Sequence, residues 1–206
     1  TTYYVASTSG QGAGSTFTFS NASATGPNGP TQAQITAAYA GSSLANNDTI
    51  NTQGIQEWVV PMSGTYQIQA NGAQGGGNGG LGARMQGEFS LTQGQKLFIV
   101  VGQQGNGPVD ANACGGGGGS FVTTGAGSYT TSTALLVAGG GGGQSPQVGN
   151  PGLTTNNGGQ GENCQPGGTG GNGRADASGC GSGAGGAGGF LSDGASGGSW
   201  GSQRGF

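Results

Sequence analysis

The runs GGGGG (139–143), GGTGGNG (167–173) and GCGSGAGGAGG (179–189) decide how this chain is organised. Residues 139–206 hold 27 of the 54 glycines. Ordering a glycine backbone costs at least about 1–2 kcal/mol per residue, and no side chain can offset that cost. Hydrogen bonds between neighbouring extended chains can offset it, because glycine lacks the Cβ that would hold the chains apart. The runs therefore predict an ordered bundle of polyglycine II helices over 139–206.

A solvated Gly/Ser linker is the alternative interpretation of the same stretch. Large apolar residues interrupt it, among them Phe190, Leu191, Trp200 and Phe206, and a solvated linker has no need of them. Collagen is excluded because there is no strict Gly-X-Y repeat. We therefore favour an ordered glycine-rich region.

The chain before residue 139 carries short alternations of apolar and polar residues separated by turn residues. The alternation in STFTFS (15–20) is typical of a half-buried strand. Predicted strands span 17–19, 54–60, 65–70, 85–91, 96–101, 119–124 and 134–138. Short strands at this spacing indicate a β-sandwich or jelly roll, with the apolar run 96–101 at its centre and Trp58 in its core.

One short α-helix is predicted over 31–40 (TQAQITAAYA). Ile35, Ala38 and Tyr39 would form its apolar face, and Gly41 suits the C-terminal cap. The chain as a whole is thus expected to be mainly β in three regions. These are an N-terminal arm (1–16), a β-sandwich with short Gly-rich insertions (17–138) and a polyglycine II region (139–206).

Composition excludes several classes of function. Charged residues make up 5% of the chain, against about 25% in ordinary globular proteins, and the net charge is −3. So sparse a charge does not favour nucleic acid or an anionic membrane surface. No stretch approaches the roughly 20 apolar residues that a membrane-spanning helix needs. We expect no nucleic-acid partner and no membrane insertion.

Catalytic and cofactor motifs are not evident in the sequence. There is no histidine, so the usual base for a Ser or Thr nucleophile is missing. The glycine runs at 115–119 and 139–143 lack the GK[ST] ending of a phosphate loop. The seven carboxylates are scattered among turns, which does not favour a glycosidase pair. We expect no enzymatic activity, no cofactor and no metal site.

The three cysteines, Cys114, Cys164 and Cys180, cannot all pair within one chain. A bond between Cys164 and Cys180 would staple two glycine-rich runs and contribute about 3 kcal/mol. Cys114 would then be free or paired between subunits. Asn21-Ala-Ser and Asn47-Asp-Thr match the N-glycosylation tripeptide, which is frequent by chance in a chain rich in Ser, Thr and Asn.

Several ordered blocks carry a family resemblance. They are FSNASATGPNGPTQAQITAAYAG (19–41), GIQEWVVPMSGTYQIQANGAQGG (54–76), FSLTQGQKLFIVVGQQG (89–105), GGGGGSFV (115–122) and LLVAGGGGG (135–143). Together they resemble the glycine-rich extracellular domain of the anaplastic lymphoma kinase and leukocyte tyrosine kinase receptors, which also occurs in secreted microbial proteins. That resemblance implies an extracellular, tumour-necrosis-factor-like β-sandwich with an inserted polyglycine II bundle and no enzymatic activity. In the receptors the domain binds a small protein ligand.

One departure from the family motivates an assembly hypothesis. The family returns from its glycine-rich region with a final strand, whereas this sequence stops inside that region, so we expect an unpaired sheet edge. A β-prone segment on a Gly/Ser tether could supply the missing strand to a neighbouring subunit. The candidate interface residues are Thr1, Thr2, Tyr3, Tyr4, Val5, Ala6 and Ser7. The alternative is that this segment pairs within its own subunit.

Two classes of function follow. The first is a secreted structural subunit of an extracellular filament or matrix, a homopolymer assembled by β-strand donation. The second is an adhesin or receptor-type binding module that uses the glycine-rich bundle as a rigid platform for a cell-surface protein or glycan. Trp200 and Tyr129 are the aromatic candidates for such contacts. Ice binding would need a more regular glycine face than these runs give.

Overall fold

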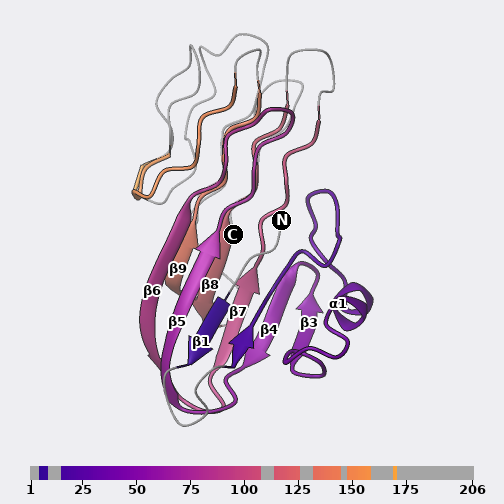
Figure 1. The fold of residues 1–206 in the computed structure, drawn as a ribbon, viewed down its shortest axis with the longest axis vertical. Helices are drawn as coiled ribbons and strands as arrows, with labels where there is room; N and C mark the ends of the chain where they lie inside the picture. Colours follow the sequence, from indigo (N-terminus) through magenta and orange to yellow (C-terminus); the bar gives the residue numbers. More distant parts are fainter. Residues whose placement is uncertain are drawn as a thin grey trace.

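A computed structural model describes residues 5–8, 15–107, 114–125, 132–144, 148–158 and 169–170. Within them the chain is mainly β, with two antiparallel sheets face to face and one short helix at the side (Figure 1). The elements are β1 (Val5–Thr8), β2 (Thr16–Phe17), α1 (Gln32–Ala38), β3 (Asp48–Thr52), β4 (Ile55–Val59), β5 (Gly64–Asn71), β6 (Arg84–Leu91), β7 (Lys96–Val100), β8 (Ser120–Thr124) and β9 (Thr133–Ala138). This arrangement is consistent with the expected β-sandwich.

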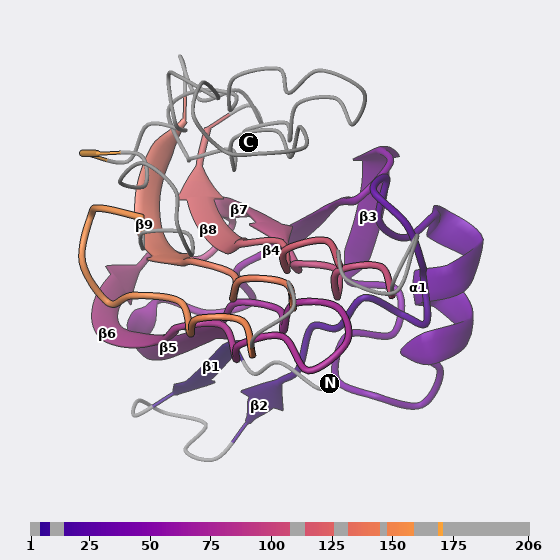
Figure 2. The same cartoon turned by 90° about the horizontal axis from the view of Figure 1, so that it is seen from above.

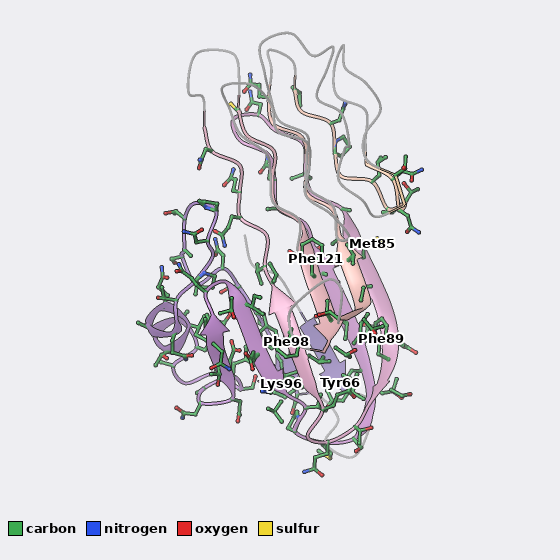
Figure 3. All side chains as sticks on the ribbon, turned by 180° about the vertical axis from the view of Figure 1, so that it is seen from behind. Tyr66, Met85, Phe89, Lys96, Phe98 and Phe121 are labelled. Carbon is green, nitrogen blue, oxygen red and sulfur yellow. The ribbon has the colours of Figure 1, made fainter. Side chains whose placement is uncertain are left out.

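The two sheets have the strand orders β2-β1-β5-β6 and β3-β4-β7-β8-β9. Strand β7 lies at the centre of the five-stranded sheet, as its apolar sequence predicts. Its residues Leu97 and Ile99 face the core, whereas Lys96 and Phe98 lie on the outer face with Phe121 of β8 (Figure 3). The alternation follows from the two-residue period of a strand.

Aromatic rings join the two sheets. Trp58 of β4 is fully buried, and its ring centroid lies 5.9 Å from that of Tyr66 of β5 in the opposite sheet. Phe17 and Phe19 approach the same indole at 4.8 and 6.0 Å. Tilted and edge-on pairs at such distances are the favoured aromatic geometries. The expectation that Trp58 belongs to the core is confirmed.

Helix α1 begins one residue later than predicted and ends two residues earlier. Thr31 is its N-cap, and the side chains of Thr31 and Gln34 form a capping box that satisfies both exposed N–H groups. Ile35 and the C-cap residue Tyr39 are buried, but Ala38 is exposed, so its expected place on the apolar face is wrong. Within the seven-residue helix, Ile35 is the one buried residue.

Two further differences from the predicted strands concern β3 and β2. Strand β3 was not predicted, because DTINT has one aliphatic side chain and no apolar alternation. It forms by pairing with β4, where Asp48 lies opposite Trp58 and Thr52 opposite Ile55. Strand β2 covers only Thr16 and Phe17 of the expected alternation in STFTFS.

Candidate functional site

Extended glycine-rich segments continue the strands beyond one end of the sandwich, as Figure 1 shows. Residues 72–83 join β5 to β6, 102–107 follow β7, 114–119 precede β8, 139–144 follow β9, and 148–153 come next along the chain. We call these five segments the glycine layer. Seen from above, they lie beside one another (Figure 2). Residues 139–144 and 148–153 thus share one layer with insertions from the expected sandwich region.

Hydrogen bonds between these segments recur at three-residue intervals. Within the segment 72–83, which folds back on itself, the N–H groups of Gly72 and Gly75 donate to the carbonyls of Ala83 (2.9 Å) and Gly80 (3.0 Å). Other donor pairs with the same spacing each bond to one neighbouring segment: Ala73 and Gly76 to 114–119, Gly80 and Ala83 to 139–144, Gly115 and Gly118 to 102–107, Cys114 and Gly117 to 139–144, and Gly141 and Gln144 to 72–83. This interval differs from the two-residue interval of a β-ladder.

Glycine is required at many of these positions by the closeness of the neighbouring backbone. At each of them an added Cβ would overlap a carbonyl oxygen of another segment. The positions are Gly72, Gly75, Gly76, Gly80, Gly105, Gly117, Gly140, Gly141, Gly143 and Gly149. The missing side chains therefore permit the hydrogen bonds, and the hydrogen bonds satisfy backbone groups that burial removes from water.

One flank of the layer carries exposed apolar side chains. Leu81, Val148 and Leu153 are 67%, 71% and 45% exposed. The segments that bear them are neighbours, since Gly152 N–H donates to the carbonyl of Leu81 at 2.8 Å. Such side chains on an otherwise side-chain-poor surface make this flank a candidate contact face.

The N-terminal strand β1 lies within the four-stranded sheet of its own chain. It is antiparallel to both neighbours, with Ser7 opposite Gln67 and Thr8 opposite Tyr66 of β5, and Val5 opposite Phe17 of β2. Strand β5 is eight residues long and pairs with β6 along its whole length, but with β1 at two positions. Strand β1 thus fills only part of the available edge.

Other candidate residues fall partly outside the described part of the chain. Of the interface candidates, Val5, Ala6 and Ser7 lie in β1, whereas Thr1, Thr2, Tyr3 and Tyr4 lie outside the described residues. The proposed partners Cys164 and Cys180, and the aromatics Tyr129 and Trp200, lie outside them as well. Cys114 is partly exposed and forms no disulfide within the described ranges.

A polar groove lies on the five-stranded sheet, away from the glycine layer. It has a volume of about 300 Å³ and is lined by Asn46, Asn47, Thr49, Asn51, Glu57, Val59 and Lys96. Glu57 accepts hydrogen bonds from Asn51 at 2.8 Å and from Lys96 at 3.0 Å. Burial acts to raise the pKa of Glu57, but these two contacts and the Lys96 charge hold it below its ordinary value. Sequence reasoning missed this groove because β3 was not predicted.

Beneath the groove lies a buried carboxyl group. Asp48 is 7% exposed, and neither of its oxygens has a hydrogen-bond partner. Burial raises the pKa of Asp48 to about 7, and the Glu57 charge adds to the rise. The Thr49 backbone N–H acts against it, although it does not form a well-aligned hydrogen bond with the carboxyl group. The indole N–H of Trp58, the register partner of Asp48, is also unpaired. A carboxyl group in this environment favours its neutral form.

The described ranges hold neither a candidate metal site nor a membrane-spanning helix. No cluster of three or more acidic, Cys or His side chains could hold a metal ion there. Among the same residues, no helix has the length and apolar character needed to cross a bilayer.

Comparison with known proteins supports the resemblance in part. No protein-family model matches the chain. The leukocyte tyrosine kinase receptor of Mus musculus is 38% identical over 97 residues, which cover 42% of this chain. The match lies in the extracellular region of the receptor and covers 11% of the receptor's length. Over these residues the chain is therefore similar to a part of that receptor's extracellular region.

Proposed function

We propose that this protein is a structural subunit of an extracellular filament or matrix, assembled when copies exchange strand β1. The observation that carries the proposal is the position of β1 between β2 and β5. It is a four-residue strand followed by the sequence SGQGAG at 9–14. A strand from a second copy would make the same backbone hydrogen bonds in the same slot.

Exchange of β1 between copies would preserve the contacts that the strand makes. Domain swapping replaces intrachain contacts by identical interchain contacts, so it costs little beyond the entropy of association. Backbone bonds to β5 supply affinity whichever chain provides the strand. Repeated head-to-tail exchange generates an open filament where the rotation between copies does not close a ring.

The glycine layer supports a role as durable material. We propose that its segments are polyglycine II helices, since this conformation has three residues per turn and the hydrogen bonds recur every three residues. We further propose that the sandwich has the tumour-necrosis-factor-like jelly-roll topology that the resemblance implies. A layer held by backbone bonds, with few charged side chains, offers little for proteases, salt or pH to act on.

A disulfide across the exchanged pair tests the proposal. Ser7 and Gln67 are register partners, and antiparallel partners have the Cα separation that a disulfide needs. Oxidation of assembled Ser7→Cys/Gln67→Cys protein should give a covalent ladder on non-reducing gels. Each single substitution controls for the native cysteines. Assembled protein that yields covalent monomers alone would show that β1 stays in its own subunit.

A second candidate is a binding module for a cell-surface protein or glycan. It is favoured by the match to a receptor's extracellular region and by exposed Leu81 and Val148 on the glycine layer. If this candidate holds, labelled monomer binds cells saturably, and Leu81→Ser/Val148→Ser weakens binding. Val59→Ser is the matched control. Val59 is 47% exposed, but it lies beside the polar groove on the five-stranded sheet, away from the glycine layer.

A further inference from the structure

We propose that Asn47 is an N-glycan acceptor and that Asn21, in the second matching tripeptide, is not. The inference concerns a covalent modification and needs passage through a secretory pathway, but it does not depend on strand exchange. Glycosylation requires Asn-X-Ser/Thr on an accessible surface, because the attached sugar is bulky and hydrophilic. The two tripeptides differ sharply in this respect.

Asn21 is engaged in the fold. Its side-chain amide donates to the carbonyl of Ala24 at 3.1 Å and to Oε1 of Gln103 at 3.3 Å. The following residues, Ala22 and Ser23, have φ angles of 46° and 60° and form a tight turn closed by Ala24 N–H on the Asn21 carbonyl. A sugar on the Asn21 amide would replace a hydrogen that the fold uses and would crowd the buried Ala22.

Asn47 is free of such constraints. It is exposed, and the contact of its side-chain amide is a long one, 3.5 Å to the carbonyl of Ser43. Thr49, which supplies the required hydroxyl, is also exposed, while Asp48 between them points inward. Thr49 faces solvent in β3, and Asn47, in the turn just before the strand, is exposed as well, so both recognition side chains are accessible.

The surroundings of Asn47 suit a carbohydrate. Asn47 lines the polar groove, together with the amide of Asn51 and the Glu57–Lys96 ion pair. A first sugar attached at Asn47 would lie against these donors and acceptors and would cover the exposed side chain of Val59. The glycan would stand on the five-stranded sheet, whereas β1 belongs to the four-stranded sheet. It would shield one surface from lateral association and leave the β1 slot open.

Secretion from cultured eukaryotic cells tests the proposal. The intact chain should carry one N-glycan, removed by peptide N-glycosidase with conversion of Asn47 to Asp in the peptide mass spectrum. Thr49→Val should abolish the glycan, while Thr49→Ser retains the tripeptide and should keep it. Ser23→Ala removes the other tripeptide without touching the Asn21 side chain and should leave the glycan unchanged.

Two outcomes would overturn the proposal. One is secreted, folded protein with a bare Asn47. The other is a glycan on Asn21 in protein whose thermal unfolding matches that of the Ser23→Ala variant, since this would show that the turn accepts a sugar. Circular dichroism of each variant separates loss of the glycan from loss of the fold.

Discussion

The backbone carbonyl of Gly117 lies where a Cβ on Gly140 would have to be, whereas the adjacent Gly139 has its nearest neighbour, the Leu153 carbonyl, 4.0 Å from such a Cβ. We therefore predict that Gly140→Ala lowers the free energy of unfolding by at least about 2 kcal/mol, because the neighbouring chain must be displaced. Urea unfolding followed by intrinsic fluorescence measures the change.

Gly139→Ala is the matched control, one residue away in the same segment. Neither glycine has a positive φ, so alanine is not strained at either position. The control should change stability by less than about 0.5 kcal/mol, or stabilise slightly by restricting the unfolded chain. Equal effects of the two substitutions would mean that the segments are not packed backbone to backbone.

Stability should fall as pH rises from about 4 to about 7. Folded Asp48 has a pKa of about 7, against 3.8 for the exposed group, so between these values the folded state holds a proton that the unfolded state has lost. The unfolded state then binds fewer protons, so stability decreases between these two pKa values, by about 4 kcal/mol in total, and levels off above pH 7. Urea midpoints from about pH 4 to pH 8 measure the slope.

Asp48→Asn should flatten that slope, because asparagine cannot ionise. The variant should be more stable than the parent at pH 8 and close to it at about pH 4. Glu57, whose pKa is lowered, acts in the opposite sense at more acidic pH and does not mask the effect. An unchanged slope in Asp48→Asn would assign the pH dependence to another group.

Tyr39→Phe should cost about 1–3 kcal/mol of stability. The Tyr39 hydroxyl donates to Oε1 of the buried Gln56 at 2.7 Å and accepts the N–H of Ser20 at 2.8 Å. Its removal leaves both groups without a partner away from water. Tyr66→Phe is the control, because its hydroxyl bonds to the carbonyl of exposed Met62, where water can replace it. Equal costs would contradict this account.

Local pattern predicted the fold where side chains alternate cleanly. The apolar run of β7 indicated its central position, and the spacing of Ile35 and Tyr39 indicated the helix, whereas its capping box of Thr31 and Gln34 was not recognised in the sequence. Strand β3 escaped prediction because its inward residue Asp48 is polar, and pairing with Trp58 across the ladder is a tertiary effect. A period-2 search that admits Asp at inward positions would have found it.

The sequence predicted backbone hydrogen bonding between glycine-rich segments, but not which segments take part. Sequence placed the ordered glycine region after residue 138, because the longest runs lie there. In the structure, Gly141 and Gly117 bond to each other across 24 positions of chain, and segments from between the strands contribute equally. Glycine runs have no side chains that could specify their neighbours. The strands of the sandwich fix where each run begins, and these positions determine which runs lie side by side.

The most direct test of the assembly proposal is negative-stain electron microscopy of the intact chain beside a version that lacks Thr1–Ser7. The account predicts filaments from the intact chain and monodisperse particles, with the β-rich circular dichroism retained, from the shortened one. Filaments from both would contradict strand exchange. Monodisperse particles from both would contradict the structural role and leave the binding module as the function to pursue.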